Sequence, residues 1–69
     1  MKRYISAASK KLKVGDYVHI VGDGWYAGEW GVIKYINLED DEYHVAIANG
    51  IDTPVFSRNE LKLMKYKPI

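Results

Sequence analysis

Aromatic and basic side chains are the residues of this chain with the clearest capacity for chemistry. Aromatic rings can stack on nucleobases or supply contact area at a protein interface. Lysine ammonium groups attract phosphates. The candidates for stacking on bases are Tyr17 and Trp25. The candidates for phosphate contacts are Lys10, Lys11, Lys13, Lys62 and Lys65. This set predicts a surface that contacts nucleic acid, with RNA preferred over DNA.

The charges are segregated along the chain although the net charge is only +1. Residues 1–13 hold five basic residues and no acid, whereas residues 14–57 hold eight acids and only Lys34. Residues 58–69 hold four basic residues against Glu60. If the two basic ends meet in the fold, they form the positive patch that is typical of nucleic-acid binding. The alternative is that these lysines only solvate the ends of the chain.

A second hypothesis places a protein partner on the glycine-rich segment 22–29 and the residue after it. This segment has three glycines and no basic residue, and its acids would repel phosphates. The candidate partner-binding residues are Asp23, Trp25, Tyr26, Glu29 and Trp30. The alternative for Tyr26 and Trp30 is that they fold back and cover a small core.

Several other chemistries have no support in the sequence. The chain has no cysteine, no GxxxxGK[ST] phosphate loop and no supported Ser-His-Asp arrangement. His19 and His44 are expected on the surface, and the acidic run 39–42 is expected to be solvated rather than to hold a metal. A domain of 69 residues also has little volume for a substrate pocket. We therefore expect a non-enzymatic protein with no cofactor, no metal and no small-molecule substrate.

Short β-like runs must position these residues. Alternating or β-rich patterns predict strands at 17–21, 30–36, 43–48, 51–56 and 61–64. The residues expected to face the core are Val18, Ile20, Ile33, Tyr43, Val45, Ile47, Leu61 and Leu63. Asn49-Gly50 predicts a type I′ hairpin turn. Pro54 predicts an edge or interrupted strand. Ser57 and Glu60 match a capping box, which predicts a 3₁₀ turn before the last strand.

These elements predict one small all-β domain, a partly open five-stranded SH3-like barrel, in preference to an OB-fold. The expected organisation is a basic N-terminal arm at 1–11, the barrel at 12–65 and a tail at 66–69. No apolar run is long enough to cross a membrane, and the start of the chain lacks a signal-peptide pattern. With no cysteine, a cytoplasmic location is expected.

The segment 15–36 resembles the KOW motif of ribosomal proteins and NusG-type elongation factors. The matching residues are Gly15, Asp16, Val18, Ile20, Gly24, Gly28, Gly31, Ile33 and Ile36. The resemblance implies an SH3-like barrel that binds RNA or protein. RNA-binding ribosomal versions tend to carry lysines where this loop has Asp23 and Glu29, so the resemblance implies the barrel more strongly than the ligand. A looser likeness, over 50–61, is to the PsaE subunit of photosystem I.

Overall fold

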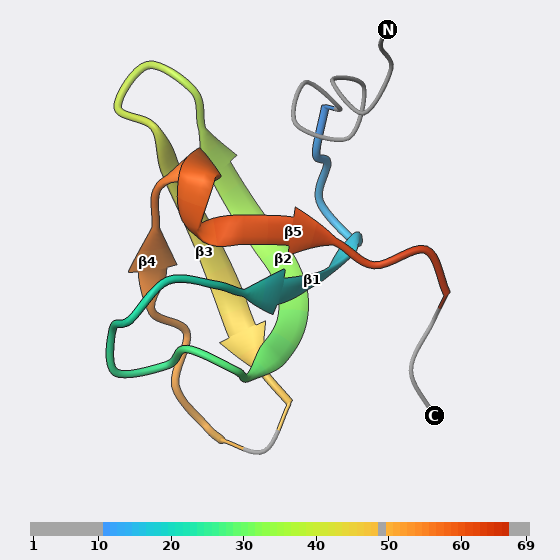
Figure 1. Ribbon diagram of the computed structural model, residues 1–69. Coiled ribbons are helices and arrows are strands. Elements are labelled where there is room, and N and C mark those ends of the chain that lie inside the picture. Colours follow the sequence, from blue (N-terminus) through green and yellow to red (C-terminus); the bar gives the residue numbers. More distant parts are fainter. Residues whose placement is uncertain (1–10, 49, 67–69) are drawn as a thin grey trace, which may run out of the picture.

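The computed structural model describes residues 11–48 and 50–66, which form a single antiparallel sheet. The elements in chain order are β1 (Tyr17–Ile20), β2 (Trp30–Asn37), β3 (Glu42–Ile47), β4 (Val55–Phe56), the 3₁₀ turn η1 (Arg58–Glu60) and β5 (Leu61–Leu63). The strand order in the sheet is β4-β3-β2-β1-β5 (Figure 1). The predicted all-β class, the five strands and the 3₁₀ turn before the last strand are confirmed.

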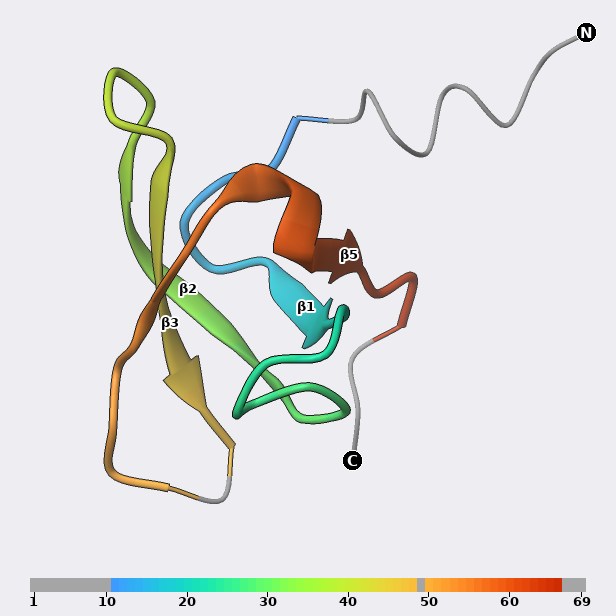
Figure 2. The same ribbon diagram turned by 60° about the vertical axis from the view of Figure 1, so that its left-hand side comes forward.

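The sheet curls around its core. β2 and β3 form a long twisted hairpin, and β1 with β5 lies across one side of it (Figures 1 and 2). η1 joins β4 to β5, the two outermost strands of the sheet. The buried apolar side chains form one cluster on the inner face: Leu12, Val18, Ile20, Ile33, Tyr43, Val45, Ile47, Phe56 and Leu61. None of the described residues belongs to a helix long and apolar enough to span a membrane.

The period-two pattern of the strands correctly predicted which side chains are buried. In β1, Val18 and Ile20 are buried while His19 between them is exposed. β3 alternates in the same way along its whole length. Ile33 on β2 is fully buried. Successive side chains of a strand point to opposite faces, so one face of this sheet packs inward and the other remains available for contacts.

Gly31 marks a close approach between β2 and β3. A Cβ atom at this position would overlap the carbonyl oxygen of Ala46 and lie 2.7 Å from Cγ1 of Val45. Glycine has no Cβ atom, which allows the two backbones to lie this close. The β2–β3 register shift lies further on, between Ile33 and Tyr35.

The predicted fourth strand over 51–56 is too long. Only Val55 and Phe56 form β4, because Pro54 has no N–H to donate to a ladder. The preceding chain still follows β3, since the carbonyls of Pro54 and Asp52 accept from the N–H groups of Val45 and Ile47. The other strand ends agree with prediction or differ from it by one residue. The predicted Asn49-Gly50 turn includes residue 49, which is outside the described residues, as are residues 1–10 and 67–69.

Candidate functional site

A row of side chains crosses the outer face of the sheet, opposite the core. His19 of β1 lies directly opposite Trp30 of β2 and Lys62 of β5. Cross-strand partners share a face, so these three side chains stand side by side. Tyr17 is on the same face two residues before His19, and its ring centroid is 5.9 Å from that of Trp30 with a 31° tilt. We call Tyr17, His19, Trp30 and Lys62 the outer-face row.

The outer-face row combines two aromatic rings with exposed polar groups. Tyr17 and Trp30 are half-buried, whereas His19 and Lys62 are exposed. Trp30 was predicted to act with Trp25 in the loop or to cover the core. It begins β2, as predicted, and its ring pairs with that of Tyr17 because the β1–β2 register places it opposite His19. The rings are therefore fixed by strand pairing.

The lysines before β1 and after β5 lie at the same end of the sheet. β1 and β5 are antiparallel, and the N–H of Met64 bonds to the carbonyl of Tyr17 at 2.9 Å. Lys13 precedes the start of β1, and Lys65 follows the end of β5 (Figure 1). Lys11 and Lys65 are exposed. The ammonium of Lys13 is 3.2 Å from the carboxylate of Asp16 and remains largely exposed. The other predicted contact, Lys10, is outside the described residues.

The predicted loop residues are at the other end of β1. Trp25 is 91% exposed, and Asp23 and Glu29 are exposed beside it in the sequence. Trp25 is thus separated from Tyr17, with which it was grouped for stacking. The structure divides the predicted contact residues into an outer-face group and a loop group.

Tyr26 differs from its neighbours because it packs inward. Its ring meets Phe56 edge-on at 6.0 Å, and its hydroxyl donates to Oδ2 of Asp52 at 2.9 Å. This hydrogen bond, with burial and the charge of Asp52 adding to it, raises the pKa of Tyr26 above its usual value. The alternative of a covering role is correct for Tyr26.

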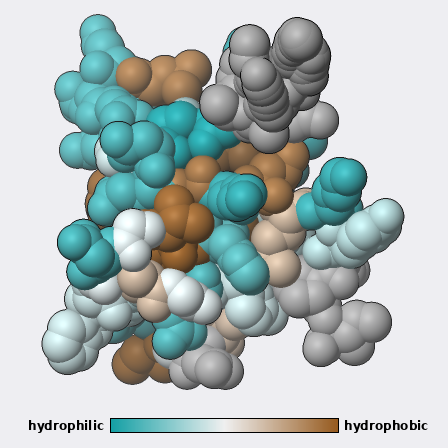
Figure 3. Space-filling model, in the orientation of Figure 1, coloured by the Kyte–Doolittle hydropathy of each residue, from teal (hydrophilic) through white to brown (hydrophobic). Residues whose placement is uncertain are grey.

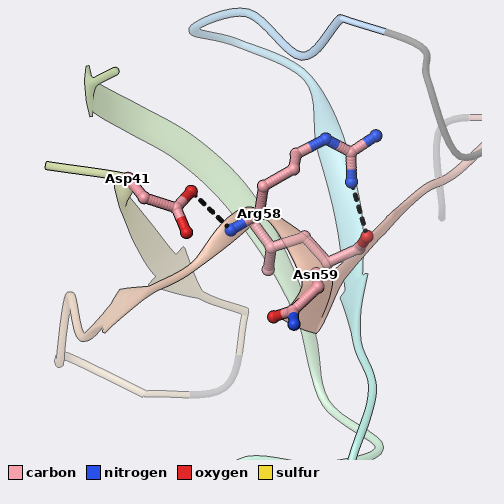
Figure 4. A pocket seen from close by; sticks show the side chains of 4 residues that line it. Asp41, Arg58 and Asn59 are labelled. Carbon is pink, nitrogen blue, oxygen red and sulfur yellow. Dashed lines mark hydrogen bonds between the residues drawn. The ribbon is translucent and has the colours of Figure 1, made fainter. Parts of the chain in front are cut away.

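A pocket that the sequence did not predict lies between the β2–β3 turn and η1 (Figure 4). Its volume is about 410 Å³, and Asp41, Arg58, Asn59 and Leu61 line it. Oδ1 of Asp41 accepts the backbone N–H of Arg58 at 2.9 Å, and Nη1 of Arg58 donates to the carbonyl of Leu61. The first bond ties the β2–β3 turn to η1, where Glu60 accepts the N–H of Ser57 in the predicted capping box. No local pattern links Asp41 to Arg58, which is 17 residues away.

We predict that Asp41→Ala destabilises the domain by about 2 kcal/mol. The change removes the acceptor for Arg58 and places an alanine at a positive φ of 54°, and each loss costs about 1 kcal/mol. Urea unfolding followed by circular dichroism measures the effect. Asp41→Asn is the control, because asparagine keeps an acceptor oxygen and tolerates this conformation. An equal loss in both variants would show that the carboxylate charge, not the geometry, is what matters.

The histidines do not come together. His19 faces Trp30, whereas His44 faces Tyr35, whose ring it meets edge-on at 5.0 Å. Across the described ranges, no three His, Asp or Glu side chains are grouped in a way that could hold a metal ion.

Fold and surface together define a small all-β domain with an aromatic and cationic outer face and an acidic loop region. No protein-family model matches the chain, and no curated protein matches it in sequence.

Proposed function

We propose that this domain is a non-enzymatic module that binds nucleic acid, RNA in preference to DNA, through the outer-face row and the adjacent lysines. The observation that carries the proposal is the Tyr17–Trp30 ring pair, held on the same face as His19 and Lys62. Proteins that bind single-stranded nucleic acid combine aromatic rings, on which bases stack, with positive charge that follows the phosphate backbone.

The spacing of the strands suits this role. Neighbouring strands are about 4.8 Å apart, which puts the Cα atoms of Trp30 and Lys62 about 10 Å apart across β1. A base stacked on Tyr17 or Trp30 would therefore have its own or the next phosphate within reach of Lys62. Lys65 and Lys13 extend the positive charge beyond the ends of β5 and β1. We infer that single strands are preferred, since their bases are free to stack.

We infer that the curled sheet is an SH3-like barrel of the KOW type. The strand order β4-β3-β2-β1-β5 and the 3₁₀ turn between β4 and β5 support it. The absence of cysteine supports a cytoplasmic setting.

The test is a titration of isotope-labelled protein with an oligouridine of about eight nucleotides, repeated between about 50 and 200 mM salt. We expect shifts at Tyr17, His19, Trp30 and Lys62, and weaker binding as salt rises. A deoxy-oligonucleotide of the same length should bind less tightly.

Two variants test the named contacts. The logarithm of the binding constant falls linearly with the logarithm of the salt concentration, and Lys62→Gln should make this slope shallower by about 0.7. That is the value for one phosphate contact on a single strand. Tyr17→Leu keeps an apolar side chain but removes the ring, and it should weaken binding about tenfold. Leu38→Glu is the matched control for Lys62→Gln: it lowers the net charge equally, but it lies in the exposed β2–β3 turn. If Leu38→Glu flattens the slope as much as Lys62→Gln, binding follows net charge alone and the assigned site is wrong.

A further inference from the structure

Two loops are held together at the end of the sheet opposite Lys11, Lys13 and Lys65. One runs from 21 to 29 and connects β1 to β2; the other precedes β4 and includes residues 50–54. The Tyr26 hydroxyl joins them through its hydrogen bond to Asp52. Both loops lie in the lower part of Figures 1 and 2. We call this region, with Asp23, Trp25, Glu29, Ile51 and Asp52, the loop end.

The loop end exposes two large apolar side chains that the core does not use. Trp25 is 91% exposed and Ile51 is 100% exposed. Trp25 directly precedes Tyr26 and Ile51 directly precedes Asp52, the two residues that the hydrogen bond joins. Brown, apolar surface reaches the outside at the lower end of the molecule in Figure 3. Trp25 and Ile51 are thus both available to a partner, on two loops that the Tyr26–Asp52 hydrogen bond joins.

The charged residues of these two loops are all acidic. Asp23 and Glu29 come from the first loop and Asp52 from the second, and neither segment contains a lysine or an arginine. Carboxylates repel a phosphate backbone and attract ammonium and guanidinium groups. The chemistry of the loop end is thus opposite to that of the outer-face row.

We propose that the loop end docks a cationic segment of a partner protein, in which arginine or lysine side chains alternate with apolar ones. The indole of Trp25 offers a face for a guanidinium group. Asp23 and Glu29 provide carboxylates for neighbouring cations, and Ile51 contacts the apolar side chains between them. This surface shares no residue with the one proposed for nucleic acid, although the two adjoin where Glu29 precedes Trp30.

The loops are ordered before any partner arrives. The Tyr26 ring packs on Phe56, and its hydroxyl fixes the second loop. In the first loop, the N–H of Ala27 bonds to Gly24 and the N–H of Gly28 bonds to Ile20. A surface fixed in this way loses little conformational entropy on binding.

The experiment is an NMR titration with a synthetic peptide of about nine residues that alternates arginine and leucine, long enough to cross both loops. The control peptide has glutamate in place of each arginine. We expect the arginine peptide to shift the Trp25 indole N–H and the backbone amides of both loops, and the glutamate peptide to shift neither. Equal shifts with the two peptides, or none at the loop end, would overturn the proposal.

Variants locate the contact. Trp25→Ala should weaken binding of the arginine peptide at least tenfold, and Asp23→Asn combined with Glu29→Gln should reduce its salt dependence. Leu38→Ala is the matched control, since Leu38 is also an exposed apolar turn residue but lies at the tip of the β2–β3 hairpin. Oligouridine binding should be unchanged in Trp25→Ala. If Leu38→Ala weakens peptide binding equally, or if oligouridine shifts the Trp25 indole, the loop end is not a site for cationic peptides.

Discussion

Replacing Gly31 with alanine is expected to destabilise the domain by about 3 kcal/mol, the upper part of the range for overpacked sites. The new methyl group would overlap the Ala46 carbonyl oxygen and press on Cγ1 of Val45. The first obstacle is backbone, which cannot move without separating β2 from β3, and Val45 is fully buried. A domain of this size has a total stability of only about 3–10 kcal/mol, so this one change would remove about a third of it or more.

Thermal and urea unfolding monitored by circular dichroism would measure this loss. Gly24→Ala is the matched control, because a Cβ atom at Gly24 has nothing within 4 Å. It should change the free energy of unfolding by less than about 1 kcal/mol. If the two variants are equally stable, the close approach of β2 to β3 at Gly31 is wrong.

Ile33→Ala is expected to cost about 3–4 kcal/mol. Ile33 is fully buried, and its truncation removes apolar contacts and leaves a cavity in a core of few residues. Ile33→Val removes one methylene group and should cost about 1 kcal/mol. The ratio of these two losses in the free energy of unfolding shows how tightly the inner face is packed.

Ile51→Ala provides the comparison for Ile33→Ala, since it is the same substitution at a position that is 100% exposed. It should leave the free energy of unfolding within about 0.5 kcal/mol of the parent protein. Urea midpoints and slopes for the three isoleucine variants can be measured together. A similar loss at both isoleucines would mean that Ile51 packs against the protein in solution, which would also remove it from the proposed docking surface.

The residues of the inner face could be predicted from the sequence because their burial follows a local, period-two pattern. Residues two apart in a strand share a face, so Val18 with Ile20 and Val45 with Ile47 identify the core without knowledge of the partners. The capping box before β5 is equally local, with Ser57 and Glu60 three residues apart. Leu12 has no such pattern, and its burial depends on how the chain enters β1.

The outer-face row could not be predicted, because it depends on register between strands. Trp30 is five residues from Trp25 and was grouped with it, but pairing with β1 places it beside Tyr17 instead. Lys62 is 43 residues after His19 in sequence and directly opposite it in the sheet. The contact of Tyr26 with Asp52 is likewise a tertiary contact that neither loop specifies alone.

Charges of both signs lie at the end of the sheet where β1 begins. Lys11, Lys13 and Lys65 are there, but Asp16 pairs with Lys13 and the β2–β3 hairpin carries the acidic run 39–42 beyond the same end. With a net charge of only +1, the protein as a whole feels little pull from a distant polyanion. The lysines would therefore attract a phosphate chain only at short range, within a Debye length of about 8–10 Å at physiological salt.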